Sequence, residues 1–314
     1  MTTVIVTGAA VIGPDLHAPR QLLPGAGAPA PGGDPADPAR VLGPRGLRYK
    51  DRATCLALAA AQLALTDAGL PGAAAETPDD CGVVVSSNHG NLDTVCDAAA
   101  TIAQHGTDGL SPMALPNASS NIAASSVAIR FRLAGPNLTL CNGPTSGLDA
   151  VHWARHLIAA GRTRRVLVIG TESDTAAVRA VTGAEGPLFD GAAAVVLEAA
   201  DSARRRSAAG RAVVGPYARA ATAQESLRAL GTLPPLALWL ASRTAVCDPP
   251  AGAGQAPVHD LNQLLGDASG ALGVLQCAAA ASLPPGSGAT LALTGDTGHD
   301  AVTTLLFEPS ENAA

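Results

Sequence analysis

The chain has 314 residues, of which 47% are hydrophobic and 2% aromatic, and its 20 basic and 26 acidic residues give a net charge of −6. This length allows either one large fold with two halves or two ordinary domains, with a sizeable core built from Ala, Val and Leu. The acidic balance, without a basic patch or an aromatic ladder, argues against nucleic acid as a partner.

The cysteines and the first residues indicate a cytoplasmic protein. The six cysteines include no CxxC pair, and five of them lie in apolar helix or strand patterns, which favours reduced, buried thiols. The opening MTTVIVTGAAVIG lacks the charged region of a signal peptide and leads directly into a strand. No apolar run is long enough to span a membrane, so we expect no membrane association.

The first part of the chain alternates strands with helices. A strand at 4–6 is expected to end at Gly8, and the Pro- and Gly-rich residues 14–50 predict an extended surface segment. Periodic apolar residues predict helices at 51–69, 91–106 and 120–135. Short apolar runs predict strands at 79–88, 164–173 and 186–201.

The second part repeats this alternation. We expect strands at 211–220, 235–242, 289–297 and 302–309, a helix near 222–231, and a turn followed by a helix at 264–283. Strands alternating with helices twice over predict a layered α/β fold with two related halves, residues 1–201 and 202–314.

The stretch GPNLTLCNGPTSGLDA, residues 135–150, joins a strand to a helix through a turn of small residues. Leu138 and Leu140 alternate with Thr139 and Cys141, as in a half-buried strand, and residues 148–162 show helical spacing. We call residues 142–146 the elbow. A helix N-terminus stabilises negative charge, so such a turn is a common place for a nucleophile and an oxyanion hole.

Several blocks of sequence resemble the β-ketoacyl synthases of the thiolase superfamily. In chain order they are VIVTGAAVIGP, LPNASSNIAASSVAIRFRLAGPNLTL, GLDA, VLVIG, FDGAAAVVLE, the turn GDASGALG, and GHDA followed by LLFEP. The resemblance implies a five-layered αβαβα fold that dimerises through the strand before the elbow. It also implies an acyl group carried on a cysteine, and two histidines that help to decarboxylate a malonyl unit.

The positions that carry the family's chemistry differ here. Counting back from Leu148, Pro144 occupies the place of the nucleophilic cysteine, and proline has neither a thiol nor a backbone N–H. The first family histidine has no counterpart, because no histidine occurs between His156 and His259. Asp267 occupies the place of the second. The glycine loop at 295–300 keeps His299 but lacks both gating phenylalanines. We therefore expect no residue active in condensation.

This combination resembles the chain-length-factor subunits of type II polyketide synthases, and the GLDA block at 147–150 fits them. The resemblance implies a non-catalytic subunit that forms a heterodimer with an active ketosynthase and shapes the acyl tunnel. An acyl carrier protein would bind mainly to the partner, and no cofactor or metal is expected. The Gln usual in aromatic-polyketide members is absent, and the chain is short for the family. Both features suggest a compact relative from polyene-type or highly reducing systems.

An enzyme alternative uses another residue of the elbow as the nucleophile. Ser146 or Thr145 would need a base within hydrogen-bond reach, and His299 is the candidate because the resemblance places it near the elbow. The plainer interpretation is that Ser146 caps the helix. Cys141 is a weaker candidate nucleophile, since the strand pattern places it toward the core or the dimer seam.

Other motifs carry weaker hypotheses. His152 and His156 have the i, i+4 spacing of a metal pair but no matching carboxylate, so packing is the simpler explanation. His89 and His259 are expected to be loop residues. Residues 7–13 resemble the TGxxxGxG opening of short-chain dehydrogenases, with Ile12 where glycine is needed. No YxxxK follows, because Tyr49 and Tyr217 are the only tyrosines.

Overall fold

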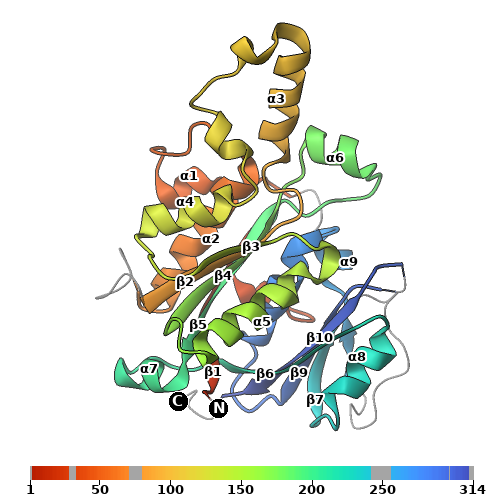
Figure 1. Ribbon diagram of the computed structural model, residues 1–314. Coiled ribbons are helices and arrows are strands. Elements are labelled where there is room, and N and C mark those ends of the chain that lie inside the picture. The colour runs from red at the N-terminus through yellow and green to blue at the C-terminus, as the bar shows by residue number, and fades with distance from the viewer. Residues whose placement is uncertain (1, 28–32, 71–79, 242–255, 297, 311–314) are drawn as a thin grey trace.

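The computed structural model describes residues 2–27, 33–70, 80–241, 256–296 and 298–310 (Figure 1). Its ten described strands form one sheet in the order β3-β2-β4-β5-β1-β6-β10-β9-β7-β8. The first five are β1 (Val4–Ile12), β2 (Cys81–Ser86), β3 (Asn137–Leu140), β4 (Arg165–Glu172) and β5 (Gly191–Ala199). The others are β6 (Ala212–Ala220), β7 (Leu236–Leu240), β8 (Val258–His259), β9 (Ala289–Thr294) and β10 (Val302–Pro309).

The sheet consists of two five-stranded halves with the same topology. In the first half, β2 runs parallel to β3 and β4, and β5 is antiparallel to both β4 and β1. In the second half, β7 runs parallel to β8 and β9, and β10 is antiparallel to both β9 and β6. The halves meet where Ile5 of β1 pairs with Val213 of β6. The prediction of two related halves is confirmed, while the division at 201/202 stays a prediction.

Helices cover the sheet halves in layers, which confirms the predicted αβαβα architecture (Figure 1). Helices α1 (Pro38–Leu42), α2 (Arg52–Asp67) and α4 (Ile122–Phe131) lie outside the first half, and α8 (Ala223–Leu230) lies outside the second. Helices α5 (Ser146–Ala159) and α10 (Leu272–Ala280) fill the space between them. The remaining helices are α3 (Leu92–His105), α6 (Ala176–Thr182), α7 (Ala200–Arg205) and α9 (Leu261–Leu265).

The central layer brings the elbow helix into backbone contact with α10. A Cβ atom on Gly147 would lie 2.6 Å from the Gly273 nitrogen, so only glycine allows this crossing. Leu148 and Val151 of α5 and Leu275 of α10 are completely buried between the sheet halves. Burying such side chains stabilises the fold by about 1.5–3 kcal/mol each. The core therefore holds the start of α5 in a fixed position.

Two predictions for the N-terminal region are wrong. Strand β1 continues through Gly8 to Ile12, because Gly8 lets the strand approach α2 closely and a register shift follows Val6. The same continuous strand rules out the dehydrogenase hypothesis, which requires a glycine-rich turn at this point. Residues 14–50 are not only surface: Leu16 and Leu22 are fully buried in the central core.

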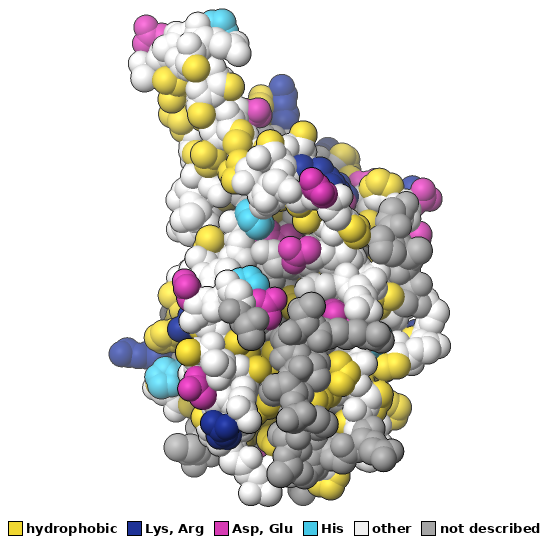
Figure 2. Space-filling view, turned by 90° about the vertical axis from the view of Figure 1, so that its right-hand side faces the viewer, with side chains coloured by type: hydrophobic (Ala, Val, Ile, Leu, Met, Phe, Trp, Pro, Cys, Tyr) yellow, Lys and Arg dark blue, Asp and Glu magenta, His cyan; other side chains and the backbone are white. Residues whose placement is uncertain are grey.

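Helix α3 projects from the body of the molecule. It contains no fully buried residue, although the predicted helix does form there. Together with residues 107–118 it makes an arm at the top of Figure 1, and Figure 2 shows hydrophobic side chains along it. Val95 and Ile102 of this helix are among the exposed large apolar residues. Across the part of the chain that the structure describes, no helix is long and apolar enough to cross a membrane.

The cysteine prediction holds only in part. Cys55, Cys81 and Cys277 are buried free thiols, as expected, and Cys96 is partly buried. Cys141 is exposed. Cys247 lies outside the described residues.

Candidate functional site

The elbow consists of the end of β3, a short 3-10 turn, η5 (Gly143–Thr145), and the first turn of α5. Gly143 has a positive φ of 79°, which lets the chain reverse direction directly before Pro144. The Thr145 hydroxyl donates to the Asp149 carboxylate at 2.9 Å, and Tyr217 of β6 donates to the same carboxylate at 2.7 Å. The turn is thus attached to its own helix and to the second half of the sheet.

Ser146 is completely buried, and asparagine side chains and backbone hold its hydroxyl. The hydroxyl accepts a hydrogen bond from the Asn142 backbone N–H at 2.8 Å. Its oxygen lies 2.8 Å from Asn142 Oδ1 and 3.1 Å from Asn88 Oδ1. Ser146 therefore does not cap α5 as predicted. It is the first residue of the helix, and its hydroxyl bonds back to Asn142 in the elbow. No hydrogen bond joins it to a histidine within the described residues.

Asn88, in the loop after β2, holds the elbow in place. Its side-chain amide donates to the Gly143 carbonyl at 3.0 Å and to the Ser269 hydroxyl at 2.8 Å. Its carbonyl oxygen accepts from the Gly143 N–H at 3.2 Å and from the Ser146 hydroxyl. The Asn88 side chain thus hydrogen-bonds to both the N–H and the C=O of Gly143. The N–H of that residue is therefore not available to hold an oxyanion.

A pocket of about 540 Å³ lies in front of the elbow. We call it the elbow pocket, and its lining is Asn88, His89, Cys141, Gly143, Pro144, Asn262, Asp267, Ser269, Leu272, Leu293, Thr294, Gly295, Asp296 and His299. Three residues singled out from the sequence, Pro144, Asp267 and His299, are brought together here. Cys141 also lines the pocket; it lies directly after β3 and is exposed, so the prediction that it falls on the strand and faces the core is wrong. Burial raises the pKa of its thiol, which disfavours the nucleophilic thiolate.

His89 is a site residue that the sequence analysis did not identify. It lies in the predicted loop, but its Nδ1 is 3.5 Å from Oε2 of Glu172, a carboxylate only 4% exposed. The interaction with Glu172 raises the pKa of His89, against the opposing effect of burial. Glu172 also accepts from the backbone N–H groups of Asn88 and Gly270 at 2.7 and 3.1 Å. The sequence signal for this site was Glu172 itself, a carboxylate at the C-terminal end of a buried parallel strand, where ligands commonly bind.

The other pocket groups predicted from the sequence have local partners. His299 Nδ1 lies 2.7 Å from Oδ1 of Asp296. The Asp267 carboxylate is exposed and accepts from the Ser269 N–H at 2.9 Å. The pocket is therefore lined by two imidazoles and by the carboxylates of Asp296 and Asp267, while Glu172, the partner of His89, lies buried behind the lining.

The remaining histidines lie elsewhere. His152 stacks on Tyr217 with ring centroids 3.8 Å apart, and burial lowers its pKa. His156 lies 6.3 Å from His152 by ring centroids. The described ranges contain no group of three or more His, Cys, Asp or Glu that could hold a metal. His259 belongs to β8 and not to a loop, and its Nε2 lies 2.9 Å from the Leu22 carbonyl oxygen.

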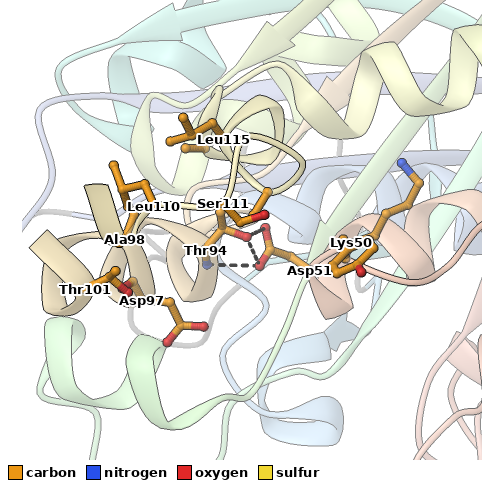
Figure 3. Close-up of a pocket in the computed structure, with 13 residues that line it drawn as sticks. Lys50, Asp51, Thr94, Asp97, Ala98, Thr101, Leu110, Ser111 and Leu115 are labelled. Carbon is orange, nitrogen blue, oxygen red and sulfur yellow. Dashed lines mark hydrogen bonds between the residues drawn. The ribbon is translucent and has the colours of Figure 1, made fainter. Parts of the chain in front are cut away.

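A second pocket, of about 380 Å³, lies at the base of the arm (Figure 3). Figure 3 shows Asp51 bonded to Thr94 of α3 on one side of the pocket, and Leu110 and Leu115 on the other. The Thr94 hydroxyl lies 2.8 Å from Oδ1 of Asp51. Burial raises the pKa of Asp51.

Known proteins resemble this chain in sequence and in fold. Residues 35–189, about half of the chain, match the N-terminal domain of β-ketoacyl synthases. The 3-oxoacyl-[acyl-carrier-protein] synthase 2 of Rhizobium meliloti (strain 1021) is 35% identical over 130 residues, which cover 41% of this chain and 31% of the relative. That of Coxiella burnetii is 29% identical over 196 residues, covering 55% and 47% respectively. The chain thus spans between about a third and half of these curated relatives.

Solved structures match over nearly the full chain. The ishigamide ketosynthase/chain length factor has a TM-score of 0.79 and 26% identity, covering 98% of this chain and 99% of that one. A β-ketoacyl synthase from Burkholderia phymatum STM815 also has a TM-score of 0.79, with 19% identity and coverage of 99% and 100%. The domain match and the shared fold show that this chain belongs to the β-ketoacyl synthase family and has its thiolase-like fold.

Proposed function

We propose that the chain is a chain-length-factor-like subunit. It pairs with an active ketosynthase, shapes the tunnel for the growing acyl chain, and carries out no condensation itself. The condensed acyl groups are tethered to an acyl carrier protein that binds mainly to the partner. The likeness to the ishigamide ketosynthase/chain length factor supports this assignment.

The elbow is the observation on which the proposal rests. Pro144 stands at the position that the family resemblance gives to the nucleophile, and it contributes neither sulfur nor an N–H donor. The adjacent Gly143 N–H already donates to Asn88, and the Ser146 hydroxyl is bonded within the elbow. Loss of one oxyanion donor alone costs about 10²–10³ in rate. The site is therefore poorly equipped for acyl transfer.

The edge of the sheet supports pairing with another chain. β3 is the terminal strand of the sheet and, among the described strands, pairs only with β2. The carbonyl groups of Pro136 and Leu140 accept hydrogen bonds from the N–H groups of Val83 and Ser87. In a parallel pair every second residue faces the neighbouring strand, so the backbone N–H and C=O of Thr139 point away from β2, toward the open edge. An open strand edge is a template for adding a strand from a partner.

The enzyme alternative, Ser146 acting with His299, has less support. Ser146 is fully buried and does not line the elbow pocket, whereas His299 lines it and is paired with Asp296. A general base must reach the proton that it removes, at about 2.6–3.2 Å or through one water. The hydroxyl of Ser146 is instead occupied by Asn142 and Asn88.

The test is co-expression with an active type II ketosynthase, followed by purification and assay with acyl carrier protein substrates. We expect a stable heterodimer that condenses acyl units, and no acyl adduct on this chain by intact mass. Thr139→Pro should abolish pairing. Val258→Pro is the matched control, because β8 ends the sheet on the opposite side and the Pro257 and His259 carbonyls accept from β7 in the same way.

Two results would contradict the proposal. One is an acyl adduct on the isolated chain that disappears in Ser146→Ala, which would establish the enzyme alternative. The other is full condensing activity in the pair after Thr139→Pro, which would show that the β3 edge is not the interface.

A further inference from the structure

Helix α5 has an exposed flank beside the open edge of the sheet. The helix follows β3 directly and packs on β3 and β2. On its other side it contacts α10, which packs on β5, β1 and β9, farther along the sheet. The flank of α5 that faces away from α10 therefore lies on the side of β3, the terminal strand. Figure 1 shows α5 in front of the sheet.

Four rings form a continuous surface on this helix. Trp153 is 48% exposed, and its ring meets that of His156 edge-on with centroids 6.0 Å apart. His156 neighbours His152, which stacks on Tyr217 of β6. The chain has only two tryptophans and two tyrosines, and one of each lies here. We call these four residues, together with Arg155, the α5 face. Exposed Trp and Tyr beside Arg are typical of the residues that dominate protein interfaces.

The fixed charge of the α5 face is positive. The helix has one acidic residue, Asp149, which is buried and accepts hydrogen bonds from within the protein. Arg219 of β6 lies 3.8 Å from that carboxylate, so Asp149 already has a basic neighbour. Within the described residues Arg155 forms no ion pair. The exposed flank thus offers an unpaired guanidinium beside Trp153 and no exposed carboxylate, which favours an acidic partner.

A second copy of this chain does not suit the same surface. In a two-fold dimer built across β3, the same patch of both copies meets itself, so each Arg155 would lie against the basic face of the other copy. Like charges brought together at an interface oppose association, whereas opposite charges select the partner. The α5 face therefore fits a different chain, one that presents an apolar pocket for Trp153 and a carboxylate for Arg155.

We propose that the α5 face selects the ketosynthase partner over a second copy of this chain. Trp153 inserts into an apolar pocket of the partner, and Arg155 pairs with a carboxylate beside that pocket. The inference rests on the proposed function, because it takes the ketosynthase as the occupant. It adds that recognition depends on side chains of α5 as well as on the backbone edge of β3.

The experiment measures the Kd between the full chain and an active type II ketosynthase by analytical ultracentrifugation. Trp153→Ala should raise the Kd by at least about thirtyfold and leave the Tm of the free chain close to wild type, because the ring is half exposed there. Arg155→Glu should raise the Kd by at least about tenfold, whereas Arg155→Lys should keep most of the affinity. The free wild-type chain should sediment as a monomer.

Arg228→Glu is the matched control, because Arg228 is exposed on α8, outside the second half of the sheet. It makes the same change of charge and should leave the Kd unchanged. A Kd that Trp153→Ala or Arg155→Glu leaves intact, or a wild-type chain that dimerises with itself, would each overturn the inference. If Thr139→Pro still abolishes pairing in that case, the subunit role stands. No pairing of the wild-type chain with the ketosynthase would refute both.

Discussion

Replacing Asn88 by alanine removes the side chain that holds the elbow. Asn88 makes four side-chain hydrogen bonds, two with Gly143, one with Ser269 and one with Ser146. At about 0.5–1.5 kcal/mol each, they set an upper limit of roughly 6 kcal/mol. In the variant, water can hydrogen-bond to the half-buried Gly143, and Ser146 keeps its hydrogen bond with Asn142. Part of the lost free energy is therefore recovered. We expect Asn88→Ala to lower the free energy of unfolding by about 2–3 kcal/mol.

The assay is urea unfolding, combined with amide hydrogen exchange at Gly143, which should accelerate in the variant. Asn91→Ala is the matched control, because Asn91 makes a single side-chain bond, to the Ala118 carbonyl at 2.8 Å. Its loss should cost about 1 kcal/mol or less. If both variants lose the same stability, or if exchange at Gly143 is unchanged, Asn88 does not hold the elbow.

Two further variants test the packing around the site. His89→Gln removes the ring paired with Glu172. The pKa of His89 is raised in the folded state, so the stability that this pair contributes is fully present below the pKa of the unfolded state. That stability is lost as the pH rises through the pKa of the folded state. The stability gap to wild type, measured by urea unfolding, should therefore narrow with rising pH, and a gap that widens would refute the pairing. Gly273→Ala should cost more than about 3 kcal/mol or prevent folding, because the backbone of Gly147 occupies the space for a Cβ; a Tm equal to wild type would contradict this contact.

The residue pattern by itself determined the order of strands and helices and the family. Periodicity predicted α2, α4, α5 and most strands, since local apolar spacing reports directly which face of an element is buried. The failures share one cause. Gly8 looked like a strand end and Leu16 and Leu22 looked like loop residues, but their roles come from packing against distant elements.

The candidate site divides in the same way. Pro144, Asp267 and His299 could be found from aligned motifs, because each lies in a block of characteristic sequence. Asn88 and His89 could not, and Glu172 was marked only by its place at the C-terminal end of a buried strand, because the three meet only when the C-terminal ends of β2 and β4 lie side by side in the sheet. The rings of the α5 face likewise gather only when β6 lies against α5. Sequence determines which side chains exist and which surface each element buries; hydrogen-bond satisfaction is a property of three-dimensional neighbours, which only the tertiary structure decides.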